Sequence, residues 1–160
     1  MFLVDTNFLG TAETLYPEDV FPTFWRELER TLFTGDVFFH SSVDTELKKW
    51  SHPRLNWYLK NVDQPKQILH PDGDEINAYR EVTELSDNHP TYNHSAATTF
   101  LNAADSWLVA SGARYGYTIV SNEKPAPNSV SKIKIPDAAD AFQVECVTLL
   151  EFLRVRRIKV

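Results

Sequence analysis

Four carboxylates occupy positions where a predicted strand ends or a predicted helix begins. They are Asp5 in MFLVDTN, Glu46 in SSVDTELKKW, Asp105 in NAADSWLVASGARYG and Glu123 in YTIVSNEK. Four carboxylates gathered in one pocket repel one another unless a cation lies among them. Hard divalent cations such as Mg²⁺ and Mn²⁺ prefer oxygen ligands. If the fold brings these acids together, the pattern predicts metal-assisted phosphodiester chemistry.

Taken singly, each acid is more typical of a solvated surface or a helix cap than of a metal site. The combination favours a shared site because open parallel sheets place their sites beyond the carboxyl ends of the strands. Asp5 and Glu123 follow predicted strands there. Glu46 and Asp105 lie on predicted helices, near enough to the first turns to point into the same crevice.

Short apolar runs predict the strands, and longer runs with apolar residues at helical spacing predict the helices. The expected strands are FLVD at 2–5, VFFH at 37–40, YTIVS at 117–121, VECV at 144–147 and, as a strand or a loop, QILH at 67–70. The expected helices cover 22–34, the segment capped by Ser41 or Ser42, 54–62, 74–85 with Asp74 as its cap, 96–115, a short stretch capped by Asp137, and 149–157. We expect a short strand or extended arm at 133–135 and loops at 86–95 and 122–132. This alternation predicts an α/β fold with a central, mainly parallel sheet.

The length and composition bound the class of protein. A chain of 160 residues with 42% hydrophobic residues predicts a single domain over residues 1–160. No apolar run reaches about 18 residues, so we expect no membrane span. The start lacks a basic segment and reaches an acid at Asp5, which is unlike a signal peptide. The single cysteine, Cys146, suits a cytoplasmic location.

The charge balance argues against a protein that binds nucleic acid by charge alone. The formal net charge is −6, whereas such proteins are usually basic. A nuclease is still compatible with this balance, because a bound metal ion offsets the acids that hold it. Lys124, Lys132 and Lys134 follow Glu123 in the sequence, and we expect this group to contact phosphate.

Three segments resemble the PIN-domain nucleases, a family that includes many bacterial ribonuclease toxins. LVDTNFL resembles the first strand of that family with its metal-binding acid, TEL carries the second acid, and ADSWLVASGARYGYTIVSNE resembles the block of acid, helix, glycine, strand, hydroxyl residue and acid. The resemblance maps the four acids to Asp5, Glu46, Asp105 and Glu123, with Asn7 and Ser121 as supporting polar residues. Glu123 follows Asp105 by 18 residues, which matches the family.

The last acid differs from the family pattern. PIN domains more often carry Asp at the position of Glu123, and the tail KIKIPDAADAF offers Asp137 as another acid that could complete the cluster. These departures suggest a less-characterised bacterial branch related to the VapC-type toxins.

The resemblance implies a three-layer α/β/α sandwich and an endoribonuclease that depends on Mg²⁺ or Mn²⁺. Asp5 and Asp105 would be the central metal ligands, Glu46 and Glu123 would complete the shell directly or through water, and Ser121 and Asn7 would hold a ligand in place. The family also implies RNA as substrate, a protein antitoxin as partner and a homodimer. Residues 21–32 and 54–62 are candidate docking surfaces for these partners.

Two alternatives stay open at this point. The chain could be a PIN-like binding module without catalysis, which metal titration would distinguish. A phosphatase of the haloacid dehalogenase type also begins with a strand that ends in an Asp nucleophile. That family has a second Asp two residues later, where this chain has Asn7.

Overall fold

The strands form one parallel sheet whose order reverses in the middle. The computed structural model describes residues 1–32, 34–49, 54–62 and 64–159. Within these residues the sheet has five strands in the order β3-β2-β1-β4-β5. The strands are β1 (Phe2–Val4), β2 (Val37–His40), β3 (Ile68–Leu69), β4 (Thr118–Val120) and β5 (Cys146–Val147). The chain builds outward from β1 in one direction through β2 and β3, and from β1 in the other through β4 and β5.

The point of reversal lies between β1 and β4. Leu3 of β1 pairs with Phe38 of β2 on one side and with Ile119 of β4 on the other. Leu3 and Ile119 are fully buried, as expected of parallel strands covered on both faces. Because the connections from β1 and to β4 leave the sheet in opposite directions, a crevice opens at the carboxyl ends of these two strands.

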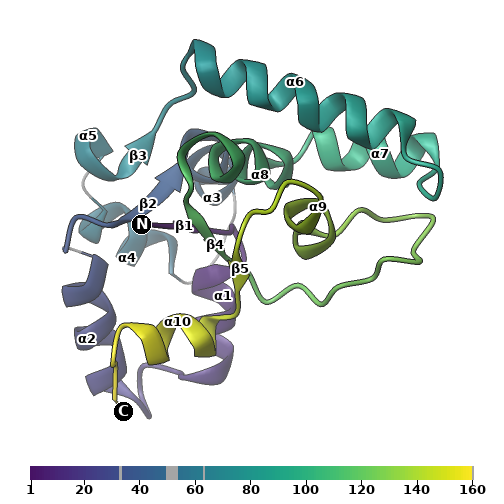
Figure 1. Cartoon of the computed structure of the whole chain (residues 1–160). Helices are drawn as coiled ribbons and strands as arrows, with labels where there is room; N and C mark the ends of the chain where they lie inside the picture. Colours follow the sequence, from purple (N-terminus) through teal and green to yellow (C-terminus); the bar gives the residue numbers. More distant parts are fainter. Residues whose placement is uncertain (33, 50–53, 63, 160) are drawn as a thin grey trace.

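Helices cover both faces of the sheet, which confirms the predicted layered α/β architecture. In Figure 1, α6, α7 and α8 lie above the sheet, and α1, α2 and α10 lie below it. The helices are α1 (Phe8–Leu15), α2 (Pro22–Leu32), α3 (Ser41–Lys49), α4 (Leu55–Asn61), α5 (Gln64–Gln67), α6 (Gly73–Asn88), α7 (His94–Leu101), α8 (Ala104–Tyr115), α9 (Ile135–Ala141) and α10 (Leu149–Val155). No helix among the described residues is both long enough and apolar enough to cross a membrane.

The core fixes α8 against the sheet. Leu108 and Val109 are fully buried. A Cβ at Gly112 would lie 2.4 Å from a methyl carbon of Val144, so glycine permits the close approach of α8 to the segment before β5. Gly116 ends the helix at a positive φ of 70°, a conformation that glycine adopts without steric cost.

The predicted single helix over residues 96–115 is wrong, because the chain breaks between α7 and α8. Ala103 is extended, with φ −97° and ψ 166°. The hydroxyl of Tyr79 donates to the carbonyl of Leu101 over 2.7 Å, and the freed amide of Ala104 donates to Glu46 over 2.9 Å. These side-chain partners replace the helical hydrogen bonds that the break removes. The break places Asp105 in the first turn of α8.

Several other elements differ from the expectation. Helix α1 was not expected, although Phe8, Leu9 and Ala12 are buried on one of its faces. Of the two alternatives expected at 133–135, the extended arm fits Lys134, with φ −97° and ψ 143°, and Ile135 already begins α9. Asp72, rather than Asp74, caps α6, and this helix extends to Asn88. The strands at 37–40, 68–69, 118–120 and 146–147 confirm the predicted runs.

The aromatic stripe at 21–32 belongs mostly to the core. Phe24, Trp25 and Leu28 on α2 are buried. The buried part of the stripe therefore packs within the chain and is not available as the docking surface that we expected. Helix α4, the other expected surface, keeps Leu59 47% exposed.

Candidate functional site

Asp5 leaves β1 at the crevice and is held by the strand beside it. Its carboxylate accepts hydrogen bonds from the Ser121 hydroxyl over 2.9 Å and from the Asn7 backbone amide over 3.4 Å. Asp5 is only 2% exposed. Burial raises its pKa from 3.8 to about 6, because desolvation outweighs the hydrogen bonds that stabilise the charge.

Asp105 enters the same site from the first turn of α8. Burial and, to a smaller extent, the charges of Asp5, Glu123 and Glu46 together raise its pKa from 3.8 to about 7. Within the described part of the chain, no hydrogen bond to its carboxylate is found. The charges of the three other predicted acids therefore all act on Asp105.

Glu46 of α3 reaches across to the start of α8. One of its oxygens accepts the amide of Ala104 over 2.9 Å, and the other accepts the hydroxyl of Thr6 over 2.5 Å. Ala104 is the first residue of α8, whose own N-cap residue makes no side-chain cap. Glu46 therefore serves as the cap of α8 and fixes the turn that carries Asp105.

Two substitutions distinguish the capping role of Glu46 from the effect of its negative charge. Glu46→Gln keeps an acceptor for the Ala104 amide, whereas Glu46→Ala leaves that amide without one. Both variants remove the same negative charge from the acidic cluster. We expect Glu46→Ala to be less stable than Glu46→Gln by about 1 kcal/mol, the usual worth of a helix cap. Urea unfolding of both variants measures the difference, and equal stabilities would contradict the capping role.

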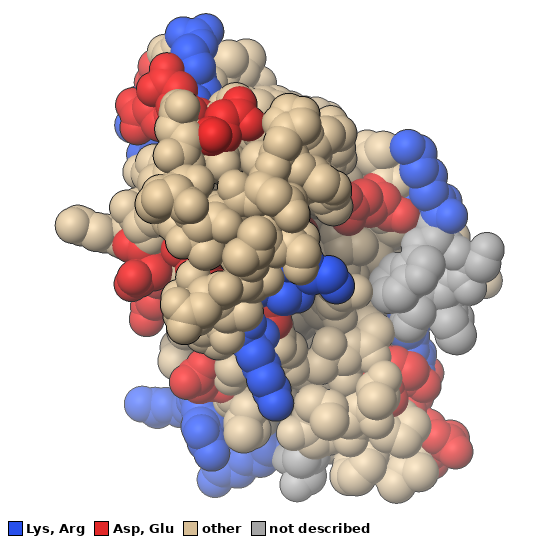
Figure 2. All heavy atoms as spheres, turned by 90° about the vertical axis from the view of Figure 1, so that its right-hand side faces the viewer, with Lys and Arg blue, Asp and Glu red and all other residues tan. Residues whose placement is uncertain are grey.

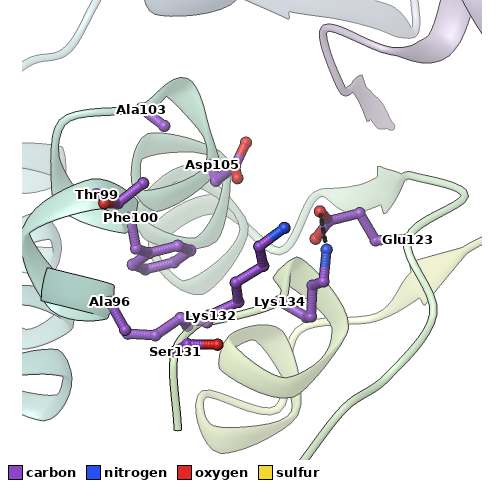
Figure 3. Close-up of a pocket in the computed structure, with 10 residues that line it drawn as sticks. Ala96, Thr99, Phe100, Ala103, Asp105, Glu123, Ser131, Lys132 and Lys134 are labelled. Carbon is purple, nitrogen blue, oxygen red and sulfur yellow. Dashed lines mark hydrogen bonds and ion pairs between the residues drawn. The ribbon is translucent and has the colours of Figure 1, made fainter. Parts of the chain in front are cut away.

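Glu123 has the corresponding role at α9. Its oxygens accept the Lys134 ammonium over 3.0 Å and the amide of Ile135, the first residue of α9, over 2.8 Å. Its own amide donates to the Ser121 hydroxyl over 3.2 Å. Ser121 thus joins Asp5 to the turn that carries Glu123. Figure 3 shows the Lys134–Glu123 pair opposite Asp105.

Asp137, the other acid considered for this cluster, is bonded elsewhere. Its carboxylate accepts the amide of Ala126 over 2.7 Å and so ties the segment after β4 to α9. Glu123 lines the same cavity as Asp105, and Asp137 is not among the residues that line it. The geometry therefore favours Glu123 over Asp137 as the fourth acid.

Two of the three predicted lysines lie at the cavity. Lys132 and Lys134 line it, whereas Lys124 is exposed and does not. Figure 3 shows the side chains of Lys132 and Lys134 extending into the space between Asp105 and Glu123. On the face seen in Figure 2, basic side chains project beside acidic ones near the middle of the molecule.

The cavity beside Asp105 and Glu123 has a volume of about 220 Å³. It is lined by Ala96, Thr99, Phe100, Ala103, Asp105, Glu123, Ser131, Lys132, Ile133 and Lys134. One end is acidic, and the wall contributed by α7 is largely apolar.

The fit of a divalent cation depends on the oxygens of the four acids. Among the described residues, no three Asp, Glu, His or Cys side chains are arranged to hold one ion together. The reason is visible in the bonds of Glu46 and Glu123, whose carboxylates face backbone amides, Thr6 and Lys134. Each carboxylate has further lone pairs, and the all-oxygen donor set suits Mg²⁺ or Mn²⁺. The residue types of the four acids therefore suit such an ion.

Two contacts at this site did not follow from the sequence. The Thr6 hydroxyl donates to Glu46. The sequence feature that could have indicated this contact is a hydroxyl residue directly after Asp5, the acid that ends a strand. Asn7 acts on Asp5 through its backbone amide rather than through its side chain, which is exposed. A polar side chain at position 7 was therefore not the feature that mattered for this contact.

Comparison with known proteins places the chain in a family. Residues 2–160 match the family model described as Domain of unknown function, DUF4411. The chain belongs to the DUF4411 family. Among curated proteins, no sequence matches this DUF4411 chain.

Two solved structures share the fold of the DUF4411 chain. The crystal structure of FitAcB from Neisseria gonorrhoeae superposes with a TM-score of 0.54 at 17% identity, covering 92% of this chain and 96% of that one. The structure of FitAB bound to an IR36 DNA fragment gives a TM-score of 0.55 at 18% identity, covering 92% and 94%. At these identities the likeness concerns the fold, which is PIN-like.

Proposed function

We propose that this DUF4411 chain is a metal-dependent endoribonuclease that acts as the toxin of a bacterial toxin–antitoxin pair. The observation that carries the proposal is the setting of Asp105. Its carboxylate is largely desolvated, lies in the field of three other acids and has no hydrogen-bond donor among the described residues. A hard cation at this point would relieve the repulsion.

The acids then divide into two kinds. Asp5 and Asp105 would hold the ion, and Glu46 and Glu123 would complete its shell directly or through water while still capping α8 and α9. When bound, Mg²⁺ or Mn²⁺ would supply charge neutralisation at the phosphate and an acidified water for in-line attack. Ser121 keeps the Asp5 carboxylate in one orientation through its 2.9 Å hydrogen bond.

The basic side chains act on the substrate in this scheme. Lys132 and Lys134 line the cavity next to Asp105 and would bind phosphate oxygens of the nucleic acid. The resemblance to ribonuclease toxins supports RNA as the substrate and a protein antitoxin and a homodimer as assembled forms. The PIN-like fold shared with FitAB agrees with that resemblance.

The test combines cleavage with metal binding. Purified protein would be incubated with single-stranded RNA and with DNA of the same sequence, with Mg²⁺, with Mn²⁺ or with EDTA. Calorimetry would measure Mn²⁺ binding to the same preparation. The proposal expects a saturable Mn²⁺ site and RNA cleavage that EDTA abolishes. A protein without a specific Mn²⁺ site would instead be the silent binding module.

Removing the ammonium beside Glu123 should strengthen metal binding. Lys134 lies 3.0 Å from Glu123 and offsets part of the negative charge on which the ion depends. We expect Lys134→Met to bind Mn²⁺ about fivefold to tenfold more tightly, which corresponds to about 1 kcal/mol of charge interaction. Calorimetry measures the change. Lys124→Met is the matched control, because Lys124 does not line the cavity, and a similar gain in both variants would reject the local competition.

A further inference from the structure

The cavity next to the acids has two chemically different ends. Asp105 and Glu123 form one end, together with the ammonium groups of Lys132 and Lys134. The other end is formed by the apolar side chains of Ala96, Phe100 and Ile133, with the hydroxyl residues Thr99 and Ser131 beside them. The acidic cluster needs only the first end, so the second end calls for a separate explanation.

The apolar end is built into the fold. Phe100 and Ile133 are 3% and 6% exposed, and they come from helix α7 and from the segment that leads into α9. That segment is tied at two points along its length. The amide of Asn93 donates to the carbonyl of Val130 over 3.0 Å, and the amide of Ala126 donates to Asp137 over 2.7 Å. The walls therefore stand opposite each other in a defined arrangement.

A ligand that matches both ends carries an anionic group and, next to it, a flat group with apolar faces and a polar edge. A nucleotide has this composition, since its phosphate suits the lysines and its base suits an aromatic and aliphatic wall. A paired base is stacked within a duplex and is not free to enter a side pocket. The chemistry thus selects a nucleotide whose base is unpaired.

We propose that the Phe100–Ile133 end of this cavity binds one unpaired nucleobase adjacent to the phosphate held at the acidic end. Thr99 and Ser131 line the same cavity and would supply hydroxyl groups near the base. The inference rests on the proposed function for the identity of the substrate. It adds that the substrate is single-stranded at this nucleotide. The pocket rather than the acids would then discriminate between bases.

The probe is a set of ligands that cannot be cleaved. The four ribonucleoside 5′-monophosphates and ribose 5-phosphate carry the same anionic group, and only ribose 5-phosphate lacks a base. Their affinities for the intact protein in Mg²⁺ would be measured by titration of amide resonances. We expect at least one mononucleotide to bind about tenfold more tightly than ribose 5-phosphate, as base stacking on aromatic side chains typically gives.

A pair of neighbouring substitutions locates the base. Thr99 and Thr98 are both exposed on α7, and only Thr99 lines the cavity. Thr99→Leu places a larger side chain at the pocket wall and should reduce the ratio of mononucleotide to ribose 5-phosphate affinity at least about threefold. Thr98→Leu should keep the wild-type ratio.

Two results would overturn the base pocket. Equal affinities for the mononucleotides and ribose 5-phosphate would reduce the cavity to an anion site. A ratio that Thr99→Leu leaves unchanged would place the base elsewhere. Neither result depends on cleavage, so a nuclease without this pocket and a nucleotide-binding protein without nuclease activity give different outcomes in the two sets of experiments.

Discussion

Asp105→Asn should abolish metal-dependent RNA cleavage and at the same time stabilise the metal-free protein. In the proposed mechanism the substitution removes a central ligand charge, so we expect the cleavage rate to fall by about a thousandfold or more. The amide has nearly the same shape as the carboxylate, and its NH₂ group can donate to the neighbouring acids. The fold should therefore be retained. Asp5→Asn should have the same effect on cleavage.

The gain in stability follows from the repulsion at this position. Burial and three neighbouring carboxylates raise the pKa of Asp105 to about 7, so its ionised form is costly in the native state. Removing that charge at pH 7.5 should raise the free energy of unfolding by about 2 kcal/mol. Urea unfolding in EDTA measures this gain, and Asp140→Asn is the control because Asp140 is exposed on α9. A loss of stability, or full RNase activity in pure Asp105→Asn protein, would be incompatible with the proposed site.

The metal-free protein should become less stable as the pH rises from about 4 to about 7. Asp5 and Asp105 have native pKa values of about 6 and about 7, and an unfolded chain releases these protons near 3.8. Between these limits the native state binds more protons than the unfolded state, so the free energy of unfolding falls with rising pH and levels off above about 7. The total is on the order of a few kcal/mol. Asp36, despite its desolvation, and Glu151 have pKa values lowered by hydrogen bonds, so these two groups act in the opposite sense.

Addition of Mn²⁺ should reverse this trend. A cation that binds the ionised acids stabilises the native state more at pH 7.5 than at pH 5, because protons compete with it at the lower pH. Urea unfolding at both pH values, with EDTA and with saturating Mn²⁺, measures the four stabilities. Asp105→Asn should flatten most of the pH dependence. A stability that rises steadily from pH 4.5 to pH 7.5 without metal would show that the two acids are not under strain.

Apolar patterning was sufficient to predict the sheet. The run VFFH became β2 over the same four residues, and the strands at 118–120 and 146–147 lie within the predicted runs. A strand buried on both faces needs only a short apolar sequence, and that signal is local. The alternation of strands and helices predicted the parallel pairing, whereas the order of the strands came only from the folded structure.

The break before Asp105 could not be predicted in this way. Residues 96–115 have a continuous helical pattern, and the interruption depends on Tyr79 and Glu46, which are distant in sequence. The Lys134–Glu123 pair has the same origin, since it depends on the folded path of the segment between β4 and α9. Spacing along the chain indicated which acids could meet, and the folded chain determined the bonds that each acid makes.

Glu46 and Glu123 accept the amides at the starts of α8 and α9, so a bound ion and these two amides would share the same carboxylates. Should Glu46 or Glu123 turn towards a bound ion, the amide of Ala104 or Ile135 would lose its acceptor. Deuterium uptake at these two amides would then report the filling of the site. Amide exchange in the first turns of α8 and α9 would thereby report whether the ion is bound.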